Sequence, residues 1–279
     1  MLGSSRMPCF PPIAPPMHTS TPGTRWRLIV TPAAGGAENM ALDEALMERA
    51  RETGEWVMRL YSWSTPTISL GRNQSARGRY DLARIDKLGF DVVRRPTGGR
   101  AILHHREITY SVTAPVAEAG DLRQSYDRIN QLLLHALNSL GVHASVFSPT
   151  ARAISPGMSP CFDEPSAGEL TVAGRKLAGS AQWRADEALL QHGSILIEDD
   201  QSLLSTLAIG GGIAVPTPAT LSEALGHAPS VDDIAVELGA AIEVVERVRP
   251  TPLTADDALS ARASALVVRY LDPAWTWRR

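Results

Sequence analysis

The chain has 279 residues, of which 44% are hydrophobic and 20% charged, and its formal net charge is −3. This composition is typical of a globular protein with enough apolar residues for a core. The charge gives no argument for nucleic acid or an anionic membrane surface as a partner, and no apolar run approaches the roughly 18 residues of a membrane span.

The first 24 residues differ in composition from the rest, since they hold six of the 20 prolines. Such a segment cannot bury enough surface to become ordered, so we predict a disordered tail over residues 1–24. It lacks the apolar stretch of a signal peptide, and we therefore expect a cytoplasmic protein. Residues 25–279 are expected to form a single catalytic domain, with a core of about 25–248 and a helical C-terminal extension of about 252–279.

The first half of this domain alternates between strand-like and helix-like patterns. Apolar residues at helical spacing, with Gly54 as the stop, predict a helix over 37–54. Short runs with β-branched and aromatic residues predict strands, and a short helix is expected among them. The expected strands are 25–31, 56–63, 67–71 and 91–95, with two more within 98–115, and the short helix is 80–90.

The second half contains the clearest helix, over residues 125–141, with Ser125 as its expected N-cap and Gly141 after its end. A strand follows at 143–147, and runs at 169–174, 176–184 and 188–198 predict an antiparallel meander. Ser230 with Asp233, and Thr254 with Asp257, resemble capping boxes that begin two further helices, and 210–218 is expected to be a flexible loop. The fold class expected from these patterns is α+β, with a central, mostly antiparallel sheet flanked by helices.

The chain has only two cysteines, Cys9 in the tail and Cys161 in the domain. A disulfide between them is not expected in a reducing compartment, and two cysteines alone cannot form a structural zinc site. Cys161 lies in the sequence SPCFDEPS, which has no helical or strand pattern. The residues alone leave two interpretations open, an inert buried thiol or a nucleophile.

Lysine is rare, because 25 of the 27 basic residues are arginine and only Lys87 and Lys176 remain. Lys87 belongs to an expected exposed helix end. Lys176 follows an arginine, so it either reflects drift or performs a task that needs a compact ammonium group. An ammonium beside Cys161 would lower the pKa of the thiol, and this pair would suit acyl transfer between thioesters.

Three other groups of residues are candidates for a site. Gly98 and Gly99, after Thr97, allow the backbone to come close to a ligand, and Arg94 and Arg95 before them could hold an anion, although a glycine hairpin with surface arginines is the favoured interpretation. His104 is either a general base or, as we favour, a structural histidine. His192 and Ser194, on either side of Gly193, either line a pocket or mark a β-bulge.

Four segments in the expected order resemble the biotin/lipoate protein ligase superfamily. They are NMALDEAL, RRPTGGRAILHHREITYSV, GRKLAGSAQWR and QHGSILIE. The resemblance extends from about residue 25 to the C-terminal WTWRR, and it implies a biotin/lipoate ligase-like catalytic domain.

One branch of this superfamily activates lipoate with ATP through a Gly-Gly-Gly turn. Here Arg100 stands at the third glycine, and the segment CFDEPSAGELTVAGRKLAGSAQ resembles the cysteine-dependent octanoyltransferases. The resemblance implies that Cys161 carries the acyl thioester and that Lys176 lowers the pKa of its thiol. The matching motifs imply a substrate site formed by Arg94, Arg95, Thr97, Gly98, Gly99, Arg100, Ala101, His104, Gly179, Ser180, Ala181 and His192.

The expected function is therefore transfer of an octanoyl group from octanoyl-acyl carrier protein to a lysine of a lipoyl domain, for which the glycine cleavage H protein is the expected acceptor. Backbone amides at Gly98, at Gly99 or in a Gly179–Ser180 turn are candidates for the oxyanion hole. We expect a monomer with no metal or cofactor. The alternatives are an ATP-dependent lipoate or octanoate ligase, an octanoyl amidotransferase between lipoyl domains, and a non-catalytic binding protein.

Overall fold

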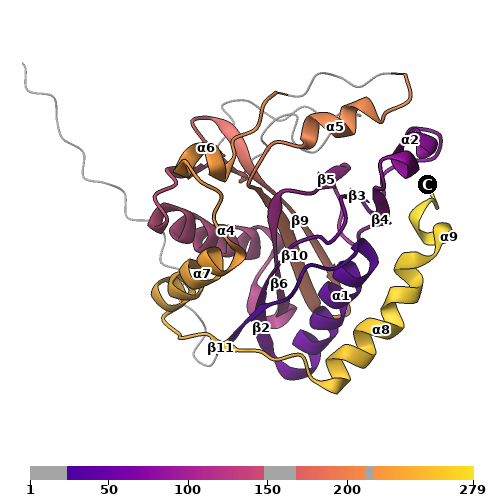
Figure 1. The fold of residues 1–279 in the computed structure, drawn as a ribbon. Coiled ribbons are helices and arrows are strands. Elements are labelled where there is room, and N and C mark those ends of the chain that lie inside the picture. Colours follow the sequence, from indigo (N-terminus) through magenta and orange to yellow (C-terminus); the bar gives the residue numbers. More distant parts are fainter. Residues whose placement is uncertain (1–23, 148–167, 211–215) are drawn as a thin grey trace, which may run out of the picture.

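The computed structural model describes residues 24–147, 168–210 and 216–279 (Figure 1). Its strands are β1 (Arg25–Val30), β2 (Glu55–Tyr61), β3 (Thr67–Leu70), β4 (Asp91–Arg94), β5 (Ile102–His104), β6 (Glu107–Pro115), β7 (Ala144–Val146), β8 (Leu170–Val172), β9 (Arg175–Ala185), β10 (Ala188–Leu196) and β11 (Thr251–Pro252). Its helices are α1 (Gly36–Thr53), α2 (Leu82–Lys87), α3 (Val116–Ala119), α4 (Leu122–Ser139), α5 (Gln201–Thr206), α6 (Leu221–Leu225), α7 (Val231–Glu246), α8 (Asp257–Leu271) and α9 (Pro273–Thr276).

The strands form two sheets. The larger sheet has the order β11-β1-β2-β6-β10-β9-β8-β7 and is antiparallel except where β1 pairs with β2 and β11. The smaller sheet has the order β4-β3-β5, with β3 parallel to β4 and antiparallel to β5. This architecture confirms the predicted α+β class, and the consecutive antiparallel pairing of β8, β9 and β10 confirms the predicted meander.

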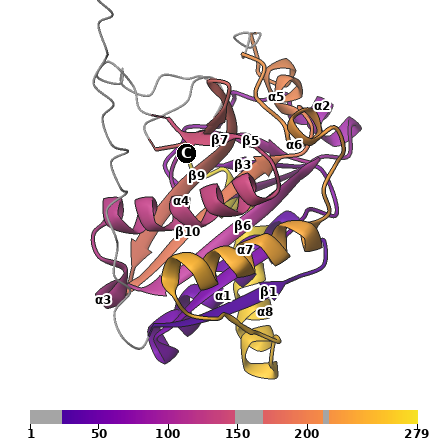
Figure 2. The ribbon, with the colours of Figure 1, turned by 90° about the vertical axis from the view of Figure 1, so that its left-hand side faces the viewer.

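Helices cover both faces of the larger sheet. Figure 2 shows α4 and α7 across one face, while α1 and α8 lie behind it on the other. The largest apolar cluster lies on the α4 and α7 face, because these helices bury apolar residues at helical spacing. Its members from α4 and α7 are Ile129, Leu132, Leu133, Ala136, Leu137, Ile234, Ala235, Leu238, Ala241 and Ile242.

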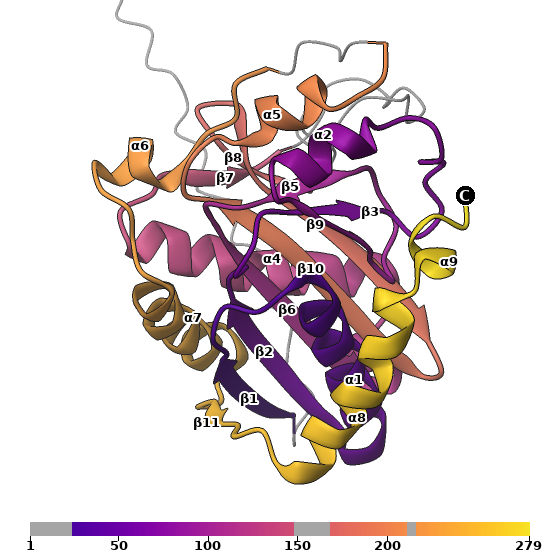
Figure 3. The ribbon, with the colours of Figure 1, turned by 45° about the vertical axis from the view of Figure 1, so that its right-hand side comes forward.

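The smaller sheet packs with α2, α5 and the C-terminal residues, and α9 lies beside this end of the molecule in Figure 3. The Trp275 indole donates to the carbonyl of Arg94 at 2.8 Å, and the Arg94 guanidinium donates to the carbonyl of Thr276 at 2.8 Å. The expected C-terminal extension therefore contacts the strand that leads into the Thr97-Gly98-Gly99 segment. Whether it is a separable unit stays a prediction.

Two helix ends follow the sequence signals. Helix α1 ends at Gly54, which has a left-handed φ of 69° and donates its N–H to the carbonyl of Ala50. Helix α7 begins with the predicted capping box, in which Ser230 and Asp233 satisfy each other's backbone N–H groups.

Two predicted N-caps are wrong. Helix α4 is capped by Asp121, which forms a capping box with Gln124, so the helix begins a turn earlier than expected and the Ser125 hydroxyl donates to the Asp121 carbonyl instead. Helix α8 is capped by Asp256, whose side chain accepts from the N–H of Leu259, rather than by Thr254. In both cases an aspartate near the predicted N-cap supplies a stronger acceptor for the free N–H groups of the first helical turn.

Three predictions concern segments wholly or largely outside the described residues. They are the disorder of the tail, the surroundings of Cys161 and the flexibility of loop 210–218.

Candidate active site

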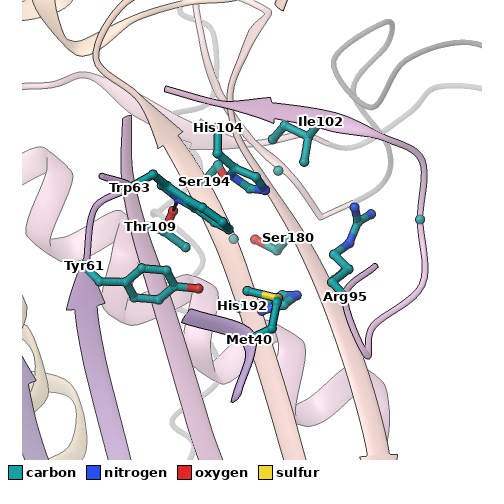
Figure 4. Close-up of a pocket in the computed structure, with 14 residues that line it drawn as sticks. Met40, Tyr61, Trp63, Arg95, Ile102, His104, Thr109, Ser180, His192 and Ser194 are labelled. Atoms are coloured by element: carbon teal, nitrogen blue, oxygen red, sulfur yellow. Dashed lines mark hydrogen bonds between the residues drawn. The ribbon is translucent and has the colours of Figure 1, made fainter. Parts of the chain in front are cut away.

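A pocket with about 440 Å³ of empty space, part of it open to solvent, lies between the two sheets, beside the N-terminal half of α1 (Figure 4). Strands β6, β9 and β10 supply part of its wall, and β5 and the segment before it supply another part. The lining residues are Met40, Tyr61, Trp63, Arg95, Gly99, Ile102, His104, Thr109, Gly179, Ser180, Ala181, His192, Gly193 and Ser194. Aromatic and aliphatic side chains thus alternate with glycines and a few polar groups, a combination suited to a small, largely apolar ligand.

Two buried acidic residues accept most of the hydrogen bonds in the polar network behind this pocket, and we call them its centres; the first is Asp43 of α1. Its carboxylate is fully buried and accepts from the guanidinium of Arg59 at 2.7 Å and from the hydroxyl of Tyr61 at 2.9 Å. It also accepts from the hydroxyl of Ser111 at 2.7 Å. Burial opposes ionisation of this carboxyl, but the Arg59 charge and the contact with His192 outweigh that effect and lower its pKa.

His192 connects Asp43 to the Thr97-Gly98-Gly99 segment. Its Nδ1 lies 3.1 Å from Asp43 Oδ2, and its Nε2 lies 2.7 Å from Thr97 Oγ1. An ionised carboxylate can only accept, so Nδ1 donates and the neutral ring accepts from the Thr97 hydroxyl at Nε2. Burial lowers the pKa of His192 from its ordinary value of 6.5, which favours the neutral ring.

Glu107 of β6 is the second centre. Its Oε1 accepts from the hydroxyls of Thr109 at 2.6 Å and Ser194 at 2.7 Å, and it lies 2.7 Å from Nδ1 of His104. The other ring nitrogen of His104 lies 2.7 Å from Ser69 Oγ. Both nitrogens therefore have partners, an arrangement that agrees with the favoured interpretation of a structural histidine.

Trp63 covers the ring of His104. The two rings are stacked with their centroids 4.0 Å apart and an angle of 14° between their planes, and the Trp63 indole donates to Thr109 Oγ1 at 2.8 Å. Trp63 thus has one ring face against the histidine and its polar N–H satisfied, so the indole can line the pocket without a free donor.

Arg95 shapes the segment that borders the pocket. Its guanidinium donates to the carbonyls of Gly98 at 2.8 Å and Arg100 at 2.7 Å. Gly99 has a φ of 92°, and a Cβ placed on Gly71 would lie 2.0 Å from its carbonyl oxygen. Two backbone segments therefore meet here at a distance that only a glycine at position 71 allows, and the predicted close approach of the Gly98-Gly99 backbone to a ligand stays a prediction.

Arg94 is fully buried and supports the same region from behind. Its guanidinium donates to carbonyls of Thr276, Gly71 and Gln74. Burial, together with the nearby charges of Arg278 and Arg279, lowers its pKa to about 10. Since Arg94 is 0% and Arg95 5% exposed, the favoured interpretation of surface arginines is wrong.

Lys176 lies on β9 and is buried, with Nζ 2.7 Å from Oε1 of Glu169. A buried ammonium is costly without an opposite charge, and Glu169 supplies one. Lys87, in contrast, is exposed at the end of α2, as predicted. Of the two lysines, the buried one is thus held in an ion pair.

The structure brings together seven of the predicted substrate-site residues around the pocket. They are Arg95, Gly99, His104, Gly179, Ser180, Ala181 and His192. The predicted residues that do not line it are Arg94, Thr97, Gly98, Arg100, Ala101 and Lys176, of which Thr97 reaches the site through His192. Cys161 lies outside the described residues.

Two details of the sequence interpretation are corrected by the strand geometry. Gly179 and Ser180 lie inside β9 rather than in a turn, and they pair with Ser194 and Gly193 of β10. The register of β10 runs without a shift on both sides from His192 to Ser194, so the bulge interpretation is wrong. His192 and Ser194 line the pocket, which agrees with the other interpretation of these two residues.

Sequence reasoning missed several residues of the site. Tyr61, Trp63 and Ile102 were predicted only as parts of strands. Asp43 lies in the segment NMALDEAL and Glu107 in RRPTGGRAILHHREITYSV, so the family resemblance included both residues, but neither was singled out as a site residue. Their partners come from distant parts of the chain.

The described residues contain no group of three or more His, Cys, Asp or Glu side chains that could hold a metal ion. Among them, no helix is both long and apolar enough to cross a membrane.

Comparison with known proteins places this site in a family. Residues 36–243 match the lipoyl protein ligase A/B catalytic domain. The octanoyltransferase LipM of Kyrpidia tusciae is 37% identical over 279 aligned residues, which cover 91% of this chain and 99% of that protein. The octanoyltransferase LipM of Carboxydothermus hydrogenoformans is 45% identical over 179 residues, covering 63% of this chain and 66% of that protein.

The fold is also that of solved relatives. A lipoate-protein ligase A solved with bound ATP superposes with a TM-score of 0.73 at 21% identity, covering 91% of this chain and 98% of that one. The family match covers most of the chain and includes both centres of the polar network, Asp43 and Glu107, so the predicted resemblance is confirmed. The chain belongs to the lipoyl protein ligase A/B catalytic domain family.

Proposed function

We propose that this protein is an octanoyltransferase of lipoate biosynthesis that forms an octanoyl thioester on Cys161. The observation that carries the proposal is its similarity to octanoyltransferases, one of which it covers over 99% of that protein's length. The pocket supports it, because walls made by side chains such as Met40, Trp63 and Ile102 suit a short acyl chain.

The proposed reaction has two steps. The Cys161 thiolate attacks the carbonyl carbon of octanoyl-acyl carrier protein, the carrier's thioester bond breaks, and the carrier leaves as a thiolate that takes up a proton from water. The amine of a lysine on a lipoyl domain, such as the glycine cleavage H protein, then attacks the enzyme thioester. An amide forms, the amine loses a proton, and the Cys161 thiolate is released.

In this proposal Lys176 stabilises the thiolate of Cys161, and Glu169 positions Lys176. The 2.7 Å contact between Lys176 Nζ and Glu169 Oε1 holds the ammonium at a defined place on β9. The backbone at Gly99 lines the pocket and is the proposed donor to the oxyanion.

The test is incubation with octanoyl-acyl carrier protein followed by intact mass analysis. We expect one octanoyl adduct, lost in Cys161→Ala and kept in the matched control Cys9→Ala. An adduct that survives Cys161→Ala would refute the thioester mechanism. Lys176→Ala should slow acylation and shift the pH profile of Cys161 alkylation to higher pH, and an unchanged profile would remove its role.

Three control arms separate the alternative functions. Product formed only from free octanoate and ATP, with pyrophosphate release and indifference to Cys161→Ala, would identify a ligase. Transfer only from an octanoylated lipoyl domain would identify an amidotransferase. Binding without turnover of any donor would identify a non-catalytic protein.

A further inference from the structure

Four arginines gather beside the pocket on two segments that are far apart in the sequence. Arg72 and Arg77 lie between β3 and α2, and Arg278 and Arg279 follow α9; we name these four residues the arginine surface. In Figure 3 the C-terminal residues lie beside the segment between β3 and α2. This brings four guanidinium groups together in a chain whose net charge is −3.

Backbone groups hold the two segments together. The carbonyl of Arg279 accepts from the N–H groups of Ala76 at 2.9 Å and Arg77 at 3.1 Å. The guanidinium of Arg278 donates to the carbonyl of Arg72 at 2.7 Å, and that of Arg77 donates to the carbonyl of Trp277. The arrangement is therefore built into the fold and does not depend on chance side-chain positions.

None of the four forms a salt bridge with a carboxylate in the described part of the chain. Arg72, Arg77 and Arg278 instead donate to carbonyl oxygens, and two of them also lie over indole rings, Arg72 over Trp183 and Arg278 over Trp275. Elsewhere the chain pairs its arginines with acids, as in Arg106–Asp200, Arg128–Glu246 and Arg175–Glu223. The contrast indicates that this surface is left positive.

The positive charges of the arginine surface repel one another. Burial, followed by the nearby charges of Arg72 and Arg279, lowers the pKa of Arg278. Groups of the same sign that are held together without an acid gain most from an external anion, because the anion relieves their mutual repulsion.

The arginine surface borders the pocket through its backbone. The N–H of Arg72 donates to the carbonyl of Thr97 at 2.8 Å, and the neighbouring Gly71 packs against Gly99, which lines the pocket. A partner bound here would lie next to the pocket rather than over it.

We propose that the arginine surface docks the acyl carrier protein that delivers the octanoyl thioester, through that partner's phosphate and carboxylate groups. The inference rests on the proposed function. A carrier presents its thioester on an arm attached through a phosphodiester, so its anionic base must lie beside the pocket while the arm enters it. Guanidinium groups suit this task, because they bind phosphate and carboxylate oxygens in a bidentate manner.

The test compares two octanoyl donors, octanoyl-acyl carrier protein and octanoyl-pantetheine, which lacks both the phosphate and the protein. The variant is Arg278→Glu/Arg279→Glu, with Arg278→Gln/Arg279→Gln as a milder form. The Arg279 contacts that join the two segments use a main-chain oxygen and survive in both variants, whereas the contact of the Arg278 guanidinium with the Arg72 carbonyl is lost in the glutamate variant. The control is Arg123→Glu on α4, whose side chain is 92% exposed and lies across the larger sheet from α8 (Figure 2).

We expect the KM for the carrier-bound donor to rise at least about tenfold in the double glutamate variant and less in the glutamine variant. The rise should exceed any change with octanoyl-pantetheine by at least about fivefold, and the wild-type KM for the carrier should rise with added salt. Arg123→Glu should leave the KM ratio of the two donors at its wild-type value.

Three outcomes would overturn the inference. They are an unchanged KM for the carrier-bound donor, an equal rise in KM with both donors, and a KM increase confined to the lipoyl-domain acceptor. The last would place the acceptor on this surface. Normal turnover with any of these would refute only the docking site. Failure of the wild-type protein to use either donor would instead refute the proposed function.

Discussion

Replacing Asp43 with asparagine should destabilise the protein strongly, although the two side chains have nearly the same volume. Asp43 is 0% and Arg59 1% exposed, and their charged groups are 2.7 Å apart. In the variant Arg59 keeps its hydrogen bonds to Asn39 and Thr31, but its buried charge is no longer neutralised. Removing one partner of a buried ion pair costs about 3–5 kcal/mol, and we expect about 4 kcal/mol here.

The assay is equilibrium unfolding in urea, followed by circular dichroism. With an m-value of about 2–3 kcal/mol/M, a loss of about 4 kcal/mol lowers the midpoint by about 1.3–2 M. Glu44→Gln is the matched control on the same helix. Glu44 accepts from the Tyr270 hydroxyl at 2.6 Å and pairs with Arg269, whose side chain is 38% exposed, so we expect a loss of only about 1–2 kcal/mol.

A double-mutant cycle tests the cause. Arg59→Met should cost much less in the Asp43→Asn background than in the wild type, because the variant has already lost the neutralised pair; the coupling energy should be at least about 2 kcal/mol. A loss below about 1 kcal/mol for Asp43→Asn, a loss no larger than that of Glu44→Gln, or additive single effects would refute the reasoning.

Other predictions follow from contacts around the pocket. Gly71→Ala should lower the melting temperature by several degrees, because the added Cβ would lie 2.0 Å from the carbonyl oxygen of Gly99. Gly98→Ala, whose added Cβ has no atom within 4 Å, should leave the melting temperature nearly unchanged. Equal melting temperatures for the two variants would contradict this. The free energy of unfolding should fall as the pH drops below 6.5, because His192 takes up a proton in the unfolded chain but, with its lowered pKa, not in the folded protein. Between about pH 7.5 and 5.5 the free energy of unfolding should depend less on pH in His192→Gln than in the wild type. An unchanged pH dependence would exclude this histidine as the cause. Glu169→Gln should reduce the free energy of unfolding by about 2–4 kcal/mol and slow acylation, because the carboxylate facing the Lys176 ammonium is lost; stopped acylation with full stability would instead indicate a direct role in the chemistry.

The elements that could be predicted from the sequence are those whose signals are local. Helix α1 shows its apolar face and its Gly54 stop within one stretch of the chain, and the meander of β8, β9 and β10 is marked by short turns. The helix starts at Asp121 and Asp256 were missed because several polar residues compete as caps, and only the backbone path decides among them.

The site was less predictable, because its contacts join distant residues. His192 was a candidate, but its partner Asp43 lies 149 positions away, and no local pattern connects them. Arg94 and Arg95 were expected at the surface since arginine is seldom buried. They are buried because backbone carbonyls from several segments accept from their guanidinium groups, and the path of those segments is not visible in the sequence.

The pairing of β1 with β11 has a consequence for how the chain folds during synthesis. Arg27 and Leu28 pair with Thr251 and Pro252, so the edge of the larger sheet cannot close until residues 224 positions further along the chain have left the ribosome. The buried Arg94 must also wait for the carbonyl of Thr276. Contacts this far apart in sequence form slowly, and the nascent chain must keep an unpaired strand edge from aggregating while it waits.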